Sequence, residues 1–214
     1  MRVDVVPVAA GAAPPLGGEE GVVVIDVLRA TSTVVTALGH GCRGLLPVAT
    51  PAAARREAAR LAALQPLLGG ERHGLKAKGF DLGNSPREYT PERVRDRLIV
   101  FCTTNGTRAL LRARKAARVY LGAFLNAGAL ARRLKEEEER AWLFFCAGSG
   151  GYFSWEDFLC AGQVLAVLQG LGVKLEPGDG ARAALTLESS VPAGEGEGLV
   201  GNHARYLRRL GLED

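Results

Sequence analysis

The chain is organised around the segment Val22-Val23-Val24-Ile25-Asp26-Val27-Leu28-Arg29-Ala30-Thr31-Ser32-Thr33. Its apolar start is long enough for a buried strand, and the apolar residues 34–38 predict a helix directly after it. A strand that runs into a helix start brings backbone N–H groups and the positive end of a helix dipole together, which favours an anion. Arg29 adds donors suited to phosphate or carboxylate, and Asp26 adds an oxygen ligand suited to magnesium. The segment therefore predicts a site for an anion and a divalent metal.

The composition is that of a soluble globular protein of one large or two small domains, with 214 residues, 47% of them hydrophobic and 23% charged. No uninterrupted apolar run reaches the roughly 18 residues of a membrane span. An acid at Asp4 and the lack of an apolar leader predict a cytoplasmic protein. The net charge of +4 is small and no basic–aromatic interleaving is present, so no nucleic-acid partner is expected. A homo-oligomer is left open.

The four cysteines lie far apart in apolar segments and form no CxxC pair, which predicts reduced, buried thiols rather than zinc ligands or disulfides. They are Cys42, Cys102, Cys146 and Cys160.

Strand and helix signals alternate along the chain, which predicts an α/β fold with mostly parallel strands. The expected strands are residues 3–8, 22–27, 44–48, 98–102, 118–122 and 142–146, and residues 67–71 form a short apolar stretch. The expected helices are residues 31–38, 52–64, 105–115, 126–139, 154–171, 180–187 and 199–210, with Thr50 and Thr90 as caps before prolines. The four glutamates at 136–139 are interpreted as solvated. A break near residues 86–91 predicts an N-terminal part, 1–89, and a C-terminal part, 90–214.

A second strand-to-helix junction spans residues 101–108. Capping of the helix needs one hydroxyl or amide, whereas five small polar residues stand here in a row. An anion cradle explains the excess better. The five are Thr103, Thr104, Asn105, Gly106 and Thr107.

The same junction matches Cys-x5-Arg, the spacing of cysteine phosphatases, through Cys102 and Arg108. In those enzymes a thiolate attacks phosphorus while the loop N–H groups and the arginine hold its oxygens. The interior lacks that class's glycines and no histidine precedes Cys102. A metal-independent phosphatase using Cys102 and Arg108 is thus an alternative.

A third junction spans residues 146–157 and is not a GxGxxG fingerprint, because Phe153 stands in place of the third glycine. Ser154 and Asp157 have the spacing of a capping box. Glu156 or Asp157 could instead be a metal ligand at a helix start, and the spacing favours neither interpretation.

A long polar loop, residues 72–88, follows the short apolar stretch at 67–71. Glu71 and Asp81 could join a magnesium site. Arg72 could contact an anion and His73 could donate a proton to a leaving group. The opposing interpretation is that polar residues of this loop, Asp81, Asn84 and Ser85, only close turns.

Six blocks occur in the order found in one family: Asp26-Val-Leu-Arg-Ala-Thr-Ser-Thr, Gly70-Glu-Arg, Gly79-Phe-Asp-Leu-Gly-Asn-Ser-Pro, Thr103-Thr-Asn-Gly-Thr, Cys146-Ala-Gly and Glu156-Asp157. They resemble the 2-phosphosulfolactate phosphatases, the ComB family, over residues 26–162. The resemblance implies two αβα parts with the active site in the cleft between them. It also implies magnesium-dependent hydrolysis of (R)-2-phospho-3-sulfolactate to sulfolactate and phosphate, a step toward coenzyme M.

A small, multiply anionic phosphoester needs cations and helix starts for binding, and its hydrolysis needs Mg²⁺ held by two or three carboxylates. Asp26, Glu71 and Asp157 are the expected catalytic groups and metal ligands, with Glu156 and Asp81 as further ligands. An aspartyl nucleophile stays open, as does a non-catalytic protein that binds phosphorylated metabolites. The expected substrate-binding residues are Arg29, Thr31, Ser32, Thr33, Arg72, Asn84, Ser85, Thr103, Thr104, Asn105, Gly106 and Thr107.

Overall fold

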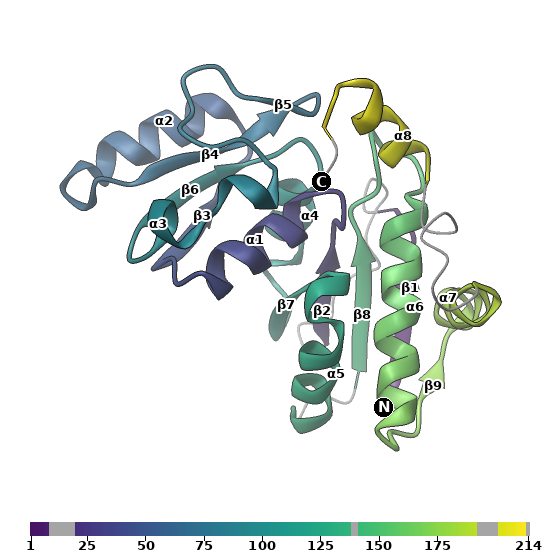
Figure 1. The fold of residues 1–214 in the computed structure, drawn as a ribbon. Coiled ribbons are helices and arrows are strands. Elements are labelled where there is room, and N and C mark those ends of the chain that lie inside the picture. The colour runs from purple at the N-terminus through teal and green to yellow at the C-terminus, as the bar shows by residue number, and fades with distance from the viewer. Residues whose placement is uncertain (9–19, 138–140, 192–200, 213–214) are drawn as a thin grey trace.

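A computed structural model describes residues 1–8, 20–137, 141–191 and 201–212. Its larger sheet is entirely parallel, with strand order β7-β2-β8-β1-β9 (Figure 1). Its strands are β1 (Arg2–Val6), β2 (Gly21–Ile25), β7 (Arg118–Gly122), β8 (Ala141–Cys146) and β9 (Glu176–Pro177). The apolar run of β2 lies inside the sheet, between β7 and β8, where it is buried throughout, as expected for a parallel strand covered on both faces.

The second sheet has the order β3-β6-β4-β5. Its strands are β3 (Gly44–Pro47), β4 (Leu67–Arg72), β5 (Leu75–Lys76) and β6 (Leu98–Cys102). The pairs β3–β6 and β4–β6 are parallel, and the short β5 pairs antiparallel with β4 at the edge.

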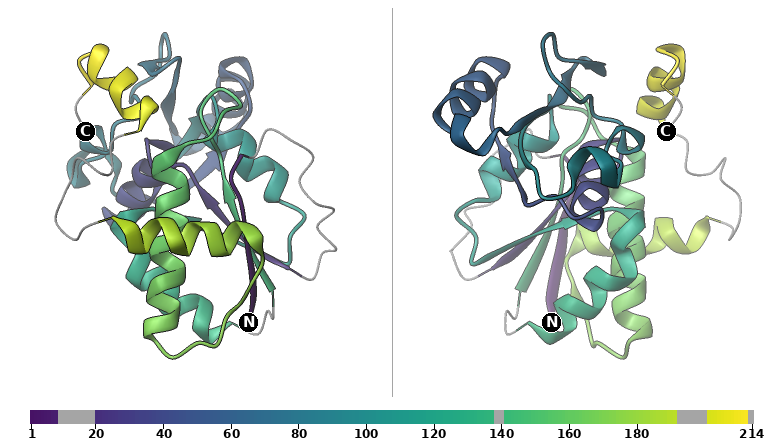
Figure 2. Two further views of the ribbon diagram at one scale, coloured as in Figure 1. Left: turned by 90° about the vertical axis from the view of Figure 1, so that its right-hand side faces the viewer. Right: turned by 60° about the vertical axis from the view of Figure 1, so that its left-hand side comes forward.

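Helices cover both faces of each sheet. They are α1 (Ala30–Gly39), α2 (Pro51–Arg60), α3 (Pro91–Val94), α4 (Gly106–Ala113), α5 (Ala127–Glu136), α6 (Trp155–Gly170), α7 (Asp179–Ser190) and α8 (Asn202–Arg209). Single 3₁₀ turns lie at Ala62–Leu64, Pro86–Glu88 and Phe124–Asn126. Figure 2 shows α7 crossing α6 on the outside of the larger sheet.

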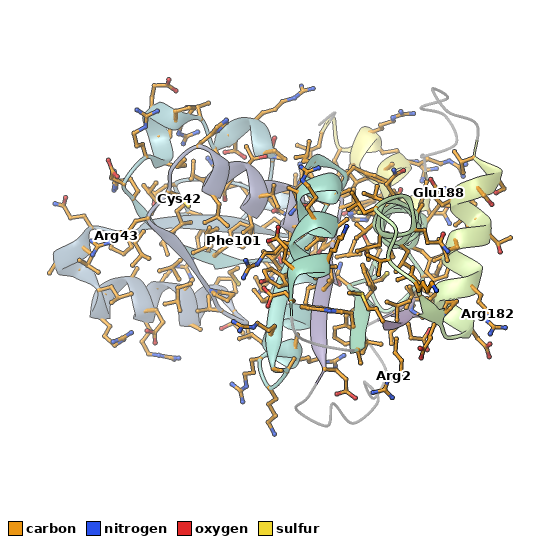
Figure 3. The ribbon with its side chains drawn as sticks, turned by 90° about the horizontal axis from the view of Figure 1, so that it is seen from below. Arg2, Cys42, Arg43, Phe101, Arg182 and Glu188 are labelled. Carbon is orange, nitrogen blue, oxygen red and sulfur yellow. The ribbon has the colours of Figure 1, made fainter. Side chains whose placement is uncertain are left out.

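Alternate residues of the central strands face opposite cores, following the period of two of a strand. In β2, Val23 and Ile25 pack with α5, α6 and α7, while Val22 and Val24 pack with α4. In β6, Ile99 packs with α1 and Val100 packs with α2. Seen from below, Phe101 and Cys42 lie within the second sheet's part of the molecule, away from Arg2 and Arg182 at the far side of the larger sheet (Figure 3).

The predicted α/β class, with two αβα-layered parts, is confirmed. The expected strands at 98–102 and 118–122 match β6 and β7 residue for residue. Thr50 caps α2, with its Oγ1 accepting a bond from the N–H of Ala53 at 3.1 Å. Thr90 stands at the N-cap position of α3, which begins at Pro91 as expected, but its side chain makes no cap hydrogen bond. None of the helices in the described ranges is long and apolar enough to cross a membrane.

The predicted boundary between residues 89 and 90 falls inside the second sheet, because β3, β4 and β5 precede it and β6 follows it. Strand pairing divides the chain differently. Residues 44–102 supply the second sheet, and segments on both sides of them supply the larger sheet. The boundary stays a prediction.

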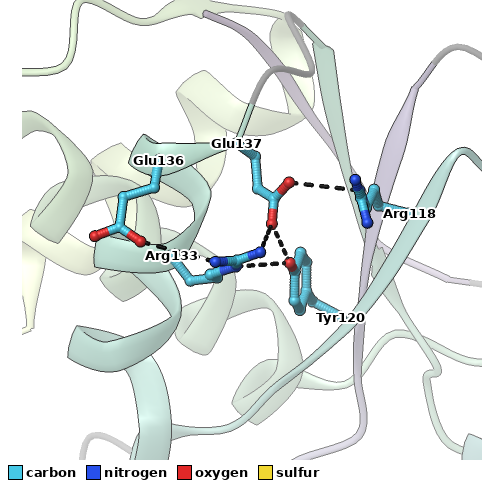
Figure 4. Close-up of polar contacts among 5 residues, drawn as sticks. All are labelled: Arg118, Tyr120, Arg133, Glu136 and Glu137. Atoms are coloured by element: carbon cyan, nitrogen blue, oxygen red, sulfur yellow. Dashed lines mark hydrogen bonds and ion pairs between the residues drawn. The ribbon is translucent and has the colours of Figure 1, made fainter.

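The end of α5 is tied to β7 by Glu137, whose side chain is only 5% exposed (Figure 4). Glu137 accepts a hydrogen bond from the Tyr120 hydroxyl and pairs with Arg133 at 2.6 Å and with Arg118 at 3.4 Å. These contacts, the Tyr120 bond first, lower the pKa of Glu137. The interpretation of the glutamates as solvated is therefore wrong for Glu137, although it holds for Glu136, which is 69% exposed. Residues 138 and 139 lie outside the described residues.

We expect Glu137→Gln to lower the unfolding temperature at pH 7, because the neutral amide weakens both ion pairs. Glu136→Gln, one residue away and exposed, is the matched control and should leave the unfolding temperature unchanged. Thermal unfolding followed by circular dichroism measures both. A lowered folded-state pKa stabilises only while the carboxylate is charged, so the difference should disappear as the pH falls below about 4. Equal unfolding temperatures for the two variants at pH 7 would contradict the role given to Glu137.

Candidate active site

A cavity of about 790 Å³ lies where the carboxyl ends of strands from both sheets meet, the usual place of ligand sites in α/β folds. Its lining comes from five places in the chain. They are the segment after β2, the end of β4, the loop after β6, the β8–α6 loop with the start of α6, and α8. Their lining residues are Asp26, Leu28, Arg29, Glu71, His73, Gly74, Thr104, Asn105, Ser149, Gly150, Tyr152, Phe153, Ser154, Trp155, Glu156, Gly201, Asn202, His203, Arg205, Tyr206 and Leu207. Asn84 adds one more side chain. Chain segments far apart in sequence therefore build one site.

Asp26 lies in the turn between β2 and α1 and lines this cavity, with 7% of its surface exposed. Its Oδ1 accepts a hydrogen bond from the N–H of Ala30 at 3.3 Å. Gly106 approaches its Oδ2 so closely that a Cβ there would lie 2.6 Å from that oxygen, which explains a glycine at this position. Burial and the nearby negative charge of Glu71 raise the pKa of Asp26 to about 7, against the opposing effect of its hydrogen bonds and of Arg29.

Glu71 lines the same cavity from the second sheet and is 6% exposed. Its carboxylate accepts bonds from the Thr104 N–H at 2.6 Å, the Thr104 hydroxyl at 3.0 Å and the Gly74 N–H at 2.8 Å. These bonds fix the end of β4 to the loop after β6. Two carboxylates, one from each sheet, thus face one cavity.

Arg29 supplies the buried positive charge of the site. It is 4% exposed, lines the cavity, and donates from Nη2 to the backbone carbonyl of Gly74 at 2.7 Å. This bond holds the Arg29 guanidinium, which follows β2 of the larger sheet, against the β4–β5 turn of the second sheet.

The hydroxyls of the first junction do not line the cavity. The Thr31 Oγ1 accepts from the N–H of Asp26 at 3.0 Å, the Ser32 hydroxyl donates to the carbonyl of Val27 at 2.7 Å, and the Thr33 hydroxyl donates to the carbonyl of Asn84 at 2.8 Å. They shape the turn that carries Asp26 rather than forming a cradle.

The second junction divides in a similar way. Thr103 and Thr107 bond each other's backbone and hydroxyl groups at 2.9–3.2 Å and stay outside the cavity, as does Gly106. Thr104 and Asn105 line it. Asn105 Oδ1 also accepts a long bond of 3.4 Å from the N–H of Gly150, which joins this loop to the third junction.

Asp157 does not line the cavity but lies 2% exposed between two strand ends. Its Oδ1 accepts from the N–H of Val27 at 2.8 Å and its Oδ2 accepts from the N–H of Gly148 at 3.1 Å. Burial, and then the charge of Asp26, raise the pKa of Asp157. The structure therefore gives each Asp157 oxygen a backbone partner outside the cavity lining.

Glu156 does reach the cavity, and is 3% exposed. Its Oε1 accepts from the N–H of Gly201 at 2.8 Å, the residue before α8, and its Oε2 accepts from the Ser154 hydroxyl at 3.1 Å. Ser154 also caps α6 by accepting from the N–H of Asp157 at 3.3 Å. Glu156 therefore holds the start of α8 at the cavity.

The polar loop after β4 contributes fewer side chains to the cavity than predicted. Arg72 points away from the cavity and donates to the Ala49 carbonyl at 2.8 Å and to the Cys102 sulfur at 2.9 Å. Asp81 accepts from the N–H of Leu68, and Ser85 accepts from the N–H of Arg87, so both serve local backbone. The loop groups that line the cavity are His73 and Asn84, and the Asn84 Oδ1 has no hydrogen-bond partner among the described residues.

Cys102 lies fully buried at the end of β6 and does not line the cavity. Burial raises the pKa of its thiol, opposed by Arg72. A cysteine nucleophile needs the opposite, a thiol that is accessible and easily ionised. Arg108 is exposed on α4, so the Cys-x5-Arg spacing does not place both groups at one site.

Sequence reasoning missed the groups that α8 and the β8–α6 loop bring to the cavity. The main ones are Ser149, Tyr152, Phe153, Asn202, His203, Arg205 and Tyr206. The Ser149 hydroxyl and the His203 Nδ1 lie 2.9 Å apart, although the two residues are separated by 54 positions. No local pattern signals such a pair.

Two carboxylates and a buried arginine at the ends of parallel strands suit an enzyme that acts on an anionic ester. A family model described as 2-phosphosulpholactate phosphatase matches residues 15–214. The chain belongs to this family of phosphoric monoester hydrolases, which confirms the resemblance.

Curated relatives support the same family. A protein of Thermotoga petrophila is 45% identical over 188 residues, covering 88% of this chain and 77% of the relative. A protein of Symbiobacterium thermophilum is 42% identical over 193 residues, covering 90% and 82%. Both carry the name probable 2-phosphosulfolactate phosphatase.

The raised pKa of Asp26 predicts that the free energy of unfolding decreases as this carboxyl group loses its proton. The unfolded chain releases this proton near pH 3.8 and the folded protein near pH 7, so stability falls as the pH rises between these values. In the presence of a chelator, Asp26→Asn should therefore be more stable than the unchanged protein at pH 8, by up to about 4 kcal/mol at ~1.36 kcal/mol per pKa unit. The gain should shrink toward zero at pH 4.

Urea unfolding of both proteins at the two pH values measures this difference. A variant that is less stable than the unchanged protein at pH 8 would show that Asp26 is not held as a destabilising charge.

Proposed function

We propose that the protein is a magnesium-dependent phosphatase that hydrolyses (R)-2-phospho-3-sulfolactate, or a closely related small anionic phosphoester, to the hydroxy acid and phosphate. The observation that carries the proposal is the convergence of Asp26, Glu71 and Arg29 on one cavity. The names of the relatives support this choice of substrate.

The donor set of the cavity fits Mg²⁺. Within the described residues no cluster of three or more His, Cys, Asp or Glu side chains forms a complete metal cage. Mg²⁺ does not need one, because it keeps several waters and is bound by one or two carboxylates together with substrate phosphate oxygens. Asp26 and Glu71 would hold it, and their mutual repulsion, which raises the pKa of Asp26, would be relieved by a cation. Asp157 is not assigned as a ligand.

The cation would neutralise the phosphoryl oxygens and polarise the phosphorus toward attack. The chain's own residues then bind and orient the ester. Arg29, fixed by Gly74, offers a guanidinium to the phosphate. Arg205 and Asn105 line the same cavity and add donors for the remaining anionic groups.

Removal of either cavity carboxylate should abolish magnesium-dependent phosphate release. We expect Asp26→Ala and Glu71→Gln each to lower kcat/KM at least about 100-fold, and a chelator to have the same effect on the unchanged protein. Glu136→Gln, which removes an exposed carboxylate from α5, is the control and should retain full activity. Phosphate release from phosphosulfolactate and from other phosphorylated hydroxy acids, with and without Mg²⁺, measures this. Undiminished turnover by Asp26→Ala would refute the proposal.

The two rival functions give different results. Cys102→Ser should be as active as the unchanged protein with Mg²⁺, because Cys102 is buried away from the cavity. Loss of activity in that variant, with activity of the unchanged protein insensitive to a chelator, would instead support the cysteine phosphatase. A non-catalytic binding protein would be stabilised thermally by phosphoesters and release phosphate from none of them.

A further inference from the structure

His203 lies in the first turn of α8 and lines the cavity that holds Asp26, Glu71 and Arg29. Its Nδ1 lies 2.9 Å from the Ser149 hydroxyl, and its ring stacks on Tyr206 with centroids 5.9 Å apart and an interplanar angle of 29°. The ring is thus held on one edge by a hydrogen bond and on one face by an aromatic ring.

The helix that carries His203 is itself attached to both parts of the protein. At its start, Gly201 donates from its N–H to Glu156 of α6. Further along, Tyr206 donates from its hydroxyl to the backbone carbonyl of His73 at 2.9 Å. Figure 1 shows α8 above the strand ends, between β5 and α6. The position of His203 is therefore set by contacts on two sides of the cavity.

Hydrolysis of an alkyl phosphoester leaves a strongly basic alkoxide, which needs a proton as the ester bond breaks. The arginines of the cavity cannot supply one, because guanidinium groups do not deprotonate in proteins. Asp26 and Glu71 are assigned to the cation, and the Tyr206 hydroxyl already donates to His73. The His73 ring is on an exposed residue at the β4–β5 turn. Glu156 also lines the cavity, but its carboxylate accepts hydrogen bonds from the Gly201 N–H and the Ser154 hydroxyl. Among the described lining residues, His203 is then the partly buried, oriented group left to donate a proton.

We propose that His203 is the general acid that protonates the leaving oxygen of the phosphoester, and that Ser149 is its positioning residue. This inference rests on the proposed function. Water adds to phosphorus, the P–O ester bond breaks with its electron pair going to the ester oxygen, and the proton of the imidazolium ring joins that oxygen. The products are the hydroxy acid and phosphate, and the imidazole regains a proton from solvent.

Ser149 selects which ring nitrogen is available. When His203 is an imidazolium, both nitrogens donate: Nδ1–H bonds to the Ser149 oxygen, and the ring also interacts with the backbone carbonyl of Leu28, which the leaving oxygen of the ester would replace as acceptor. Burial lowers the pKa of His203 in the protein without substrate, and Glu156 opposes this effect. A bound phosphoester dianion favours the charged ring further, so the proton is present when the substrate is.

Two esters that differ in leaving group test the assignment. An alkyl phosphoester, such as a 2-phosphorylated hydroxy acid, needs a proton on its leaving oxygen, whereas p-nitrophenyl phosphate leaves as a stable phenolate. His203→Gln should lower kcat for the alkyl ester about 10²- to 10⁴-fold and kcat for the aryl ester less than about 10-fold. Equal losses on both esters would overturn the general-acid role. If the unchanged protein hydrolyses neither ester, the proposed function fails instead.

Variants at Ser149 separate positioning from folding. Ser149→Ala should lower kcat for the alkyl ester more than for the aryl ester, and Ser149→Thr, which keeps a hydroxyl, should restore it. Arg208→Gln is the control on the same helix, exposed and outside the cavity lining, and should leave both rates unchanged. Failure of the threonine variant to restore the alkyl rate would remove Ser149 from the proposal.

NMR spectroscopy of the imidazole groups tests the proposal without turnover. The chain has three histidines, so His203 is assigned by the imidazole signals that disappear in His203→Gln. Inorganic phosphate added with Mg²⁺ should shift those signals in the unchanged protein and leave the His40 signals in place. Unshifted His203 signals at a phosphate concentration that shifts the Arg29 side-chain signals would overturn the proposal.

Discussion

The burial of two carboxylates, Asp26 and Glu71, at one cavity is the constraint around which the site is built. Asp26 comes from the turn after β2, an interior strand of the larger sheet, and Glu71 comes from β4 of the second sheet. Each is stabilised by backbone N–H groups, Asp26 by that of Ala30 and Glu71 by those of Gly74 and Thr104. The protein thus maintains a concentration of negative charge that costs folding stability, a common property of functional sites.

The need to hold these carboxylates in place explains why the junctions between strands and helices are rich in hydroxyl side chains. Buried backbone groups at a sharp turn need partners, and short hydroxyl side chains supply them locally. Thr31 and Ser32 bond the turn that carries Asp26, and Thr103 and Thr107 bond each other. These residues position the groups that face the cavity without facing it themselves.

The sequence predicted the interior strands well, for identifiable reasons. Of the predicted ligands, Asp26, Glu71 and Glu156 line the cavity and Asp157 does not. Central strands such as β2 and β6 are continuous apolar runs ended by polar residues, and this signal is local. Prediction from the sequence failed where the spacing of a residue fits two different roles. Asp157 has the spacing both of a capping box and of a metal ligand, and its contacts with Val27 and Gly148 depend on packing between distant segments. The pairing of Ser149 with His203 has the same origin, since it requires α8 to return to the start of α6.

The strand order also determines when each sheet can form as the chain is synthesised. The strands β1 and β2 pair with β7, β8 and β9, all of which come after residue 117, with Arg2 opposite Ala141 and Glu176. The strands of the second sheet, by contrast, all lie between residues 44 and 102. The second sheet can therefore assemble on the ribosome while the apolar strand β2 still waits for its partners. Such long-range parallel pairing is slow, so the apolar strand β2 stays uncovered for longer than the strands of the second sheet.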